Sequence, residues 1–290
     1  KTNMPVYRPL FLALAVWIAV PSQAQVPRER VDQNPVVENI FSAPSIITTQ
    51  SVTTLPSRNL NVTIHHAFAP LDAGTDGLFG LDGPANIRIG LDLGITDWLS
   101  VGVGRSRYDR LYDFRTKATL LRQRQNDSMP VHVAVAGNAA FTTVHLDDMD
   151  LIDRMRYSAS LLVARKFSDR VSVQIAPTIS HANTVFEQRA PGGTLTPENT
   201  IAAVGVGAQI DVLTWASLLA EYIPVVTDRS DGTINAMAVG VALDTGGHVF
   251  QLFLSASPYA VEQQTIGQNV DNFFEGNIRL GFTVNRVFGL

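Results

Sequence analysis

The strongest constraint in this chain is a two-residue alternation of apolar and polar residues that returns in many short runs. Leu60, Val62 and Ile64 alternate with polar neighbours, and the pattern recurs at 86–95 and 277–284. Successive side chains of a strand point to opposite faces, so each run predicts a strand with one apolar face. Further runs lie at 99–106, 111–123, 131–144, 154–166, 171–182, 200–211, 216–225, 234–243 and 248–256. The sequence therefore predicts an all-β fold of about twelve strands.

The connections between these runs alternate in length. The short turns share a motif, since 94–101 resembles 166–173 and, more loosely, 211–218. The intervening connections are longer and lie at 69–84, 145–153, 183–199, 226–233 and 257–276. Short periplasmic turns and longer extracellular loops are typical of a transmembrane barrel. Two connections do not fit this alternation, because 124–130 is long for a turn and 107–110 is short for a loop.

Composition bears on whether the sheet meets lipid or water. The 290 residues are 46% hydrophobic and 17% charged, with a net charge of −4. The polar face is built from Arg, Asp, Asn, Ser and Gly rather than from lysine-rich solvent positions. A sheet that spans lipid must close so that every backbone N–H and C=O is paired. We predict a closed antiparallel up-and-down transmembrane β-barrel over 59–290, with a periplasmic β-sandwich as the alternative.

The N-terminal residues predict export from the cytoplasm. Lys1 and Arg8 precede an apolar run at 10–20 and a small-residue segment at 21–25, which is the order of a signal peptide over 1–24. The run is shorter than the roughly 20 residues that a membrane-spanning helix needs. Residues 25–58 are polar and contain several prolines, so we expect a periplasmic N-terminal leader in which 46–52 pack locally. The chain has no cysteine, which excludes a disulfide or a lipoprotein anchor.

Two features of the strands suggest where the chain meets the membrane and the lumen. Aromatic residues near strand ends predict two girdles at the headgroup level, formed by Trp98, Phe167, Trp215 and Phe288 on the short-turn side and by Phe68, Tyr112, Phe141, Tyr157 and Tyr222 on the other. The parity of the alternation predicts that a set of charged residues points into the lumen, namely Arg88, Asp92, Asp113, Arg115, Lys117, Arg156, Glu221 and Arg279.

These inward charges have two interpretations. Rings of fixed charge set the selectivity of pores, and basic ones favour anions, so a narrow channel with a mild anion preference is one. A plugged barrel in which Arg and Asp or Glu pair internally is the other, because a buried charge needs a partner. A barrel of about twelve strands is only modestly wider than one that side chains fill, and both interpretations remain open.

Other candidate chemistries are weak. His65 and His66 are adjacent in a predicted strand and therefore face apart, so no metal site is expected. Ser180, His181 and Asn183 lie together, but the first two also face apart, and no enzyme activity is expected. Glycines at 102–104 and 204–207 lack a phosphate-binding spacing and fit small inward residues better. The acidic loops lack a calcium-binding pattern, and no cofactor is expected.

Several motifs resemble a family of bacterial outer-membrane β-barrels designated domain of unknown function five-seven-seven-seven. The resemblance runs from about Gln50 to the C-terminus and is carried by 79–82, 85–90, 101–105, 120–123, 129–131, 164–167 and 174–177. It implies a barrel in the outer membrane of a Gram-negative bacterium, and it implies no established activity or catalytic residues. One departure concerns outer-membrane barrels in general: Leu290, the last residue, is not aromatic, so Phe288 is expected to serve in the assembly signal.

Together these observations favour a porin-like passive channel for small solutes or ions. The alternative is a structural barrel with a plugged lumen that anchors a periplasmic or surface partner. The expected partners are outer-membrane lipid and lipopolysaccharide, the barrel-insertion machinery and, for the anchoring alternative, an envelope protein. The small negative net charge is unlike the basic footprint of a nucleic-acid-binding protein, so no nucleic acid is expected.

Overall fold

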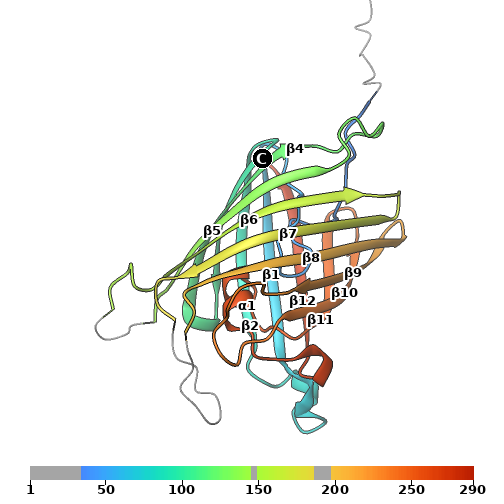
Figure 1. Cartoon of the computed structure of the whole chain (residues 1–290). Helices are drawn as coiled ribbons and strands as arrows, with labels where there is room; N and C mark the ends of the chain where they lie inside the picture. Colours follow the sequence, from blue (N-terminus) through green and yellow to red (C-terminus); the bar gives the residue numbers. More distant parts are fainter. Residues whose placement is uncertain (1–33, 145–148, 186–196) are drawn as a thin grey trace, which may run out of the picture. The chain divides into compact units, whose positions relative to one another are not determined.

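The computed structural model describes residues 34–144, 149–185 and 197–290, and the predicted signal peptide lies outside them. Over these residues twelve antiparallel strands close into a barrel in which neighbours in sequence pair and β1 pairs with β12 (Figure 1). The strands are β1 (Asn59–Pro70), β2 (Asn86–Thr96), β3 (Leu99–Ser106), β4 (Leu111–Leu121), β5 (His132–Thr142), β6 (Met155–Lys166), β7 (Val171–Ala182), β8 (Thr200–Leu213), β9 (Ala216–Ile223), β10 (Ala236–Asp244), β11 (His248–Ser255) and β12 (Arg279–Gly289). The predicted fold and strand count are confirmed.

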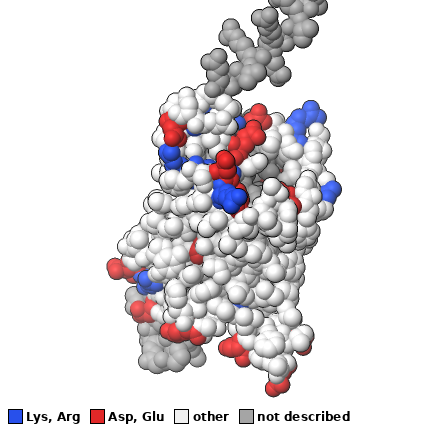
Figure 2. Space-filling model, turned by 90° about the vertical axis from the view of Figure 1, so that its right-hand side faces the viewer, with Lys and Arg blue, Asp and Glu red and all other residues white. Residues whose placement is uncertain are grey.

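The alternation in sequence becomes a division between the two faces of the barrel wall. On β3, Ser100 and Ser106 are buried on the inner face, whereas Val101 and Val103 are exposed on the outer face. Ile89 on β2 is 57% exposed and its neighbour Arg88 is 1% exposed. Figure 2 shows the outer surface of one side of the barrel. A broad uncharged band crosses this surface, and charged residues gather toward the two ends of the barrel. An apolar outer band of this kind is what the hydrocarbon of a bilayer requires.

The two ends of the barrel differ as predicted. Short turns join β2 to β3, β6 to β7, β8 to β9 and β10 to β11, and the C-terminus lies at the same end (Figure 1). Most connections at the other end are longer, although 107–110 is short. They contain short helices, namely η1 (Leu71–Ala73), η2 (Leu78–Gly80), η3 (Tyr108–Arg110), α1 (Glu262–Gln268) and η4 (Phe273–Glu275). No helix among the described residues is long and apolar enough to span a bilayer.

The described part of the predicted leader, residues 34–58, is called the N-terminal insert below. Its middle part, from Ile40 to Leu55, lies inside the barrel, whereas residues 34–39 lie at the turn end. Its apolar residues Ile40, Phe41, Ile46 and Val52 are buried and pack in one cluster with small residues of the inner wall. The expectation of a periplasmic leader is therefore corrected over these residues. The expectation was wrong because the residues that contact the insert are distant in sequence. The alternation of apolar and polar residues predicts strands, and it does not indicate where an irregular segment binds. The predicted boundaries at 24 and 58 stay predictions.

The N-terminal insert also explains why the 124–130 connection is long for a turn. Val36 forms an antiparallel bridge with Arg124, and the Val37 N–H donates to the Gln123 carbonyl at 2.8 Å. The connection between β4 and β5 therefore extends to pair with the insert at the turn end of the barrel.

The outer face generates the first prediction. Leu91 lies in the middle of β2 with its side chain exposed, so Leu91→Arg places a charge at the depth of the hydrocarbon. We expect the free energy of unfolding in lipid vesicles to fall by about 2–4 kcal/mol. Urea titration of the refolded protein measures this change. The control is Leu151→Arg in the loop between β5 and β6, where an equal loss would contradict the assignment of the outer face to lipid.

Candidate functional site in the barrel lumen

The structure places all eight predicted lumen residues on the inner face of the wall. Asp92 and Arg115 are partly buried and the other six are buried. Seven of the eight divide into three groups by contact, and Asp92 lines a small cavity described below. Arg88 and Arg115 both bind Asp113. Lys117 and Glu221 bind the N-terminal insert. Arg156 and Arg279 bind the loop between β11 and β12. The role of these residues in ion selectivity stays a prediction.

The first group is an ion-pair cluster in which Arg88 of β2 reaches Asp113 and Arg115 of β4 across the intervening strand β3. The Arg88 guanidinium donates two hydrogen bonds to the Asp113 carboxylate, at 2.9 and 2.7 Å, and Arg115 donates a third at 3.0 Å. Glycines make room for the long Arg88 side chain, because a Cβ at Gly104 would lie 2.2 Å from its Nη2. The inward glycines of β2 and β3 therefore serve as space for charged side chains, in agreement with the prediction of small inward residues.

Lys117 and Glu221 hold the N-terminal insert by its backbone. The insert turns back on itself over residues 45–50, called the insert turn below, where Ser45 bridges Gln50. Lys117 Nζ donates to the carbonyls of Pro44 and Ser51 at 2.9 and 2.8 Å, at the base of this turn. The Glu221 carboxylate accepts from three consecutive backbone N–H groups at its tip, at 2.8–3.3 Å, those of Ile47, Thr48 and Thr49.

Three inward glutamines that the sequence analysis did not select also bind the insert backbone. Gln174 accepts from the Val52 N–H at 2.8 Å and donates to the Gln50 carbonyl at 2.7 Å. Gln251 donates to the carbonyls of Ser45 and Ile46 at 3.1 and 2.6 Å. The remaining glutamine, Gln209, accepts from the Ser42 N–H at 3.0 Å. The alternation in sequence already places these glutamines on the inner face. They were not predicted as lumen residues because the prediction considered only charged side chains.

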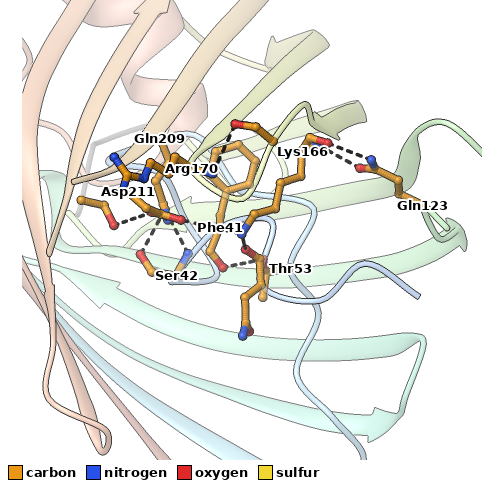
Figure 3. Close-up of polar contacts among 11 residues, drawn as sticks. Phe41, Ser42, Thr53, Gln123, Lys166, Arg170, Gln209 and Asp211 are labelled. Atoms are coloured by element: carbon orange, nitrogen blue, oxygen red, sulfur yellow. Dashed lines mark hydrogen bonds and ion pairs between the residues drawn. The ribbon is translucent and has the colours of Figure 1, made fainter. Parts of the chain in front are cut away.

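A second polar cluster fixes the insert at the turn end of the barrel (Figure 3). Gln209 joins Ser42 of the insert to the Asp211 carboxylate, to which its amide donates at 2.8 Å. Lys166 lies 3.7 Å from Asp211 and donates to the Asn39 carbonyl at 3.1 Å. Gln123 pairs with the backbone of Lys166 through both ends of its amide. These contacts connect the insert to strands β6 and β8 and to the end of β4.

From the loop end, the connection between β11 and β12 also enters the lumen and buries most of α1. Gln263 donates to Asn138 at 2.6 Å, and Arg115 donates to the Ala260 carbonyl at 3.1 Å. With the Gln268 amide turned so that its oxygen accepts, Arg156 donates to it at 2.9 and 3.0 Å. Arg279 pairs with Asp271. Burial raises the pKa of Glu262 in this loop to about 7, although Arg115 and a hydrogen bond from the Gln50 backbone oppose the shift.

The N-terminal insert and the inner wall enclose a small cavity in the lumen. A cavity of about 30 Å³ remains between the insert and strands β1 to β4, lined in part by Asp92, Arg115 and Lys117. A cavity of this size holds about two water molecules. Two wider hollows, of about 650 and 740 Å³, open at the turn end on either side of residues 35–42. The described residues thus form a lumen that is filled in its middle and hollowed at one mouth.

The predicted girdle residues lie on the outer face near the strand ends. On the short-turn side, the side chains of Trp98, Phe167, Trp215 and Phe288 are exposed, by 43–63%. On the loop side, Tyr112 and Phe141 stack with ring centroids 5.8 Å apart on neighbouring strands. Phe68, Tyr157 and Tyr222 occupy outward positions of β1, β6 and β9. Their contact with lipid headgroups stays a prediction.

The residues considered for other chemistries do not converge. His65 is buried on the inner face beside Thr283, whereas the His66 ring stacks on Phe282 on the outer face. Ser180 is buried inside, and the His181 ring contacts Thr200. Among the described residues, no group of three His, Asp or Glu side chains is arranged to hold a metal ion.

A closed antiparallel barrel with an apolar outer band, a polar inner face and short turns at one end defines a β-barrel of the outer membrane. The chain belongs to the family described as membrane-bound beta barrel domain (DUF5777), whose model matches residues 41–288. The match includes most of the N-terminal insert as well as the wall. Comparison with curated protein sequences gives no match.

Solved structures with a similar architecture are distant in sequence. The NanC porin is 7% identical, with a TM-score of 0.47, over 80% of this chain and 99% of that one. The outer membrane protein Omp33 of Acinetobacter baumannii is 10% identical, with a TM-score of 0.42, over 80% and 98%. The toluene transporter TbuX of Ralstonia pickettii is 9% identical, with a TM-score of 0.35, over 86% and 91%. These identities are too low to carry a function to this chain.

The ion-pair cluster generates a prediction about stability. Asp113→Asn removes the charge that neutralises the buried Arg88, so we expect unfolding to become easier by about 3–5 kcal/mol. Urea titration in lipid vesicles measures the loss. Asp127→Asn breaks an exposed ion pair with Arg165 and should change stability by less than about 1 kcal/mol. Equal effects of the two substitutions would show that the cluster is not a structural charge pair.

The Glu221 contacts generate a prediction about the insert itself. Glu221→Gln replaces a charged acceptor of three N–H groups, and a hydrogen bond to a charged group contributes about 1.5–3 kcal/mol. We expect hydrogen–deuterium exchange at Ile47, Thr48 and Thr49 to accelerate by one to two orders of magnitude. Asp244→Asn is the matched control, because Asp244 at the end of β10 accepts from the Gly246 N–H of the following turn and does not contact the insert turn. Unchanged exchange in Glu221→Gln would mean that other contacts hold the insert turn.

Proposed function

We propose that the protein is a non-enzymatic outer-membrane channel for small ions and solutes, and that the N-terminal insert closes it at rest. The observation that carries this proposal is that the barrel ladder is complete without the insert, because β1 pairs directly with β12. The insert contributes no strand to the wall. Side chains of the inner face bind residues 42–52, and residues 35–37 pair only with the connection between β4 and β5. Its release therefore needs no change in the hydrogen bonds that the bilayer makes obligatory.

The inner face supports a mild preference for anions once the insert has moved. The predicted lumen set contains five cations and three carboxylates, and basic rings favour anions. Asp113 neutralises one of Arg88 and Arg115, and Asp271 neutralises Arg279. The three positive charges that remain in the set, those of Lys117, Arg156 and the Asp113 cluster, exceed the two negative charges of Asp92 and Glu221. We expect the open channel to pass chloride more readily than potassium.

The anchoring alternative is supported by the small remaining cavity of about 30 Å³. In that case the insert and the loop between β11 and β12 are permanent parts of the core, and the barrel holds an envelope partner. The two proposals differ in one measurable property, which is whether displacement of the insert produces ion conductance.

A pair of variants separates them. Ile46 and Ile47 are 1% and 3% exposed and pack on opposite sides of the insert turn, so Ile46→Asp with Ile47→Asp should expel the turn and leave the wall unchanged. We expect stable anion-selective conductance steps in planar bilayers. Asn39→Asp adds a charge at an exposed position of the insert and should leave the current at the level of the unmodified protein.

An engineered disulfide that holds the insert in the lumen serves as the closed-channel control. A Cβ built at Gly205 would lie 3.5 Å from Thr49 Oγ1, so Thr49→Cys with Gly205→Cys can join the insert turn to β8. The chain has no other cysteine. Combined with the two aspartate substitutions, the oxidised bridge should abolish conductance and a reductant should restore it. If the aspartate variant folds and stays silent, the channel proposal fails and the anchoring proposal stands.

A further inference from the structure

The inner wall binds the N-terminal insert as a peptide, through its main chain. Side chains from β4, β7, β8, β9 and β11 contact backbone N–H or C=O groups between residues 42 and 52. The groups that make these contacts are Lys117, Gln174, Gln209, Glu221 and Gln251. A surface that pairs with backbone atoms recognises a chemical class, because every peptide carries the same donors and acceptors.

The chemistry of each contact suits a peptide main chain. Gln174 accepts from one residue and donates to the carbonyl two residues earlier, in the manner of a neighbouring strand. Glu221 concentrates acceptors where three N–H groups converge, and Lys117 concentrates donors where two carbonyls converge. Charged groups make stronger hydrogen bonds to neutral partners than amides do. The wall thus provides acceptors for the N–H groups and donors for the C=O groups of the main chain.

The side chains of the insert occupy shallow apolar recesses between these polar groups. Ile46, Phe41 and Val52 pack on Ala134, Ala164, Ala176 and Leu162 of the wall. A Cβ at Gly207 would lie 2.3 Å from Ile46 Cδ1, so the recess exists because position 207 is glycine. On the opposite side Ile47 packs on Leu219 and Phe253. In peptide recognition, hydrogen bonds to the main chain give affinity and pockets for side chains give specificity, and this wall provides both to the insert.

We propose that this inner wall is a peptide-binding site and that the N-terminal insert is its intramolecular occupant. The ligand class is a short peptide with small or apolar side chains, about ten residues long, which displaces the insert and occupies the lumen. This proposal rests on the proposed function, since the site becomes free only when the insert moves.

The test uses the full-length Ile46→Asp, Ile47→Asp variant in planar bilayers. A synthetic peptide with the sequence of residues 41–54 should block the current, and so should an unrelated peptide of the same length and apolar content. The same 41–54 peptide with N-methyl groups on the residues that correspond to Ile47, Thr48 and Thr49 lacks the donors for Glu221, so we expect block at least tenfold weaker. A neutral oligosaccharide of similar mass should not give the long blocks of the unmodified peptide.

Substitutions in the wall locate the site. Gln174→Ala in the same variant should shorten the blocks, whereas Thr178→Val on the same strand should not, because the Thr178 hydroxyl donates to Ser160 within the wall. The proposal is overturned if the N-methylated peptide or the sugar blocks as well as the plain peptide. Absence of any current would instead refute the proposed channel.

A second measurement keeps the proposal testable if the aspartate variant does not fold. The 41–54 peptide is added in excess to the unmodified refolded protein, and exchange at residues 45–50 is followed. Competition for the wall should accelerate exchange there and leave the amides of the barrel ladder unchanged. No acceleration with the plain peptide, at a concentration that saturates a micromolar site, counts against peptide binding.

Discussion

The requirement that every backbone polar group in the bilayer be paired governs the rest of this structure. The ladder that meets it is continuous around twelve strands and closes where β1 pairs with β12 along most of both strands. Closure removes the sheet edges that lipid could not hydrate. Because the backbone hydrogen bonds of the wall are complete, segments inside the lumen can be held by hydrogen bonds from side chains instead of by pairing with strands.

The lumen uses side chains to bind backbone. The N-terminal insert forms only short bridges of its own, so most of its N–H and C=O groups between 42 and 52 would lack partners if the inner face were apolar. Glutamine, lysine and glutamate side chains of the wall supply those partners. A polar inner face therefore does two things at once. It allows an irregular segment to be buried at membrane depth, and it keeps that segment separable from the ladder.

Much of the wall could be predicted from the sequence. The period-two alternation fixed which residues face inward, so Arg88, Asp113 and Arg115 were expected in the lumen and are there. Glycines at 102–104 were expected as small inward residues, and the structure shows the side chains that need their space. The unusual length of 124–130 was visible as well, although its pairing with Val36 and Val37 was not.

The sequence by itself determined the strands, which of their residues face lipid or the lumen, and the class of membrane protein. It could do so because the alternation of apolar and polar residues is a local property, and in a bilayer the apolar face of each strand must point outward. Only the tertiary structure decided that residues 40–55 occupy the lumen. The wall side chains that bind residues 42–54 lie 65 to 206 residues away in sequence, as in the contacts of Thr54 with Thr119 and of Ser45 with Gln251. A short, proline-dotted, weakly patterned run has no periodicity that points to such partners. Its position depends on side chains of the inner wall that match its backbone and apolar groups, and these side chains come together only when the barrel has closed.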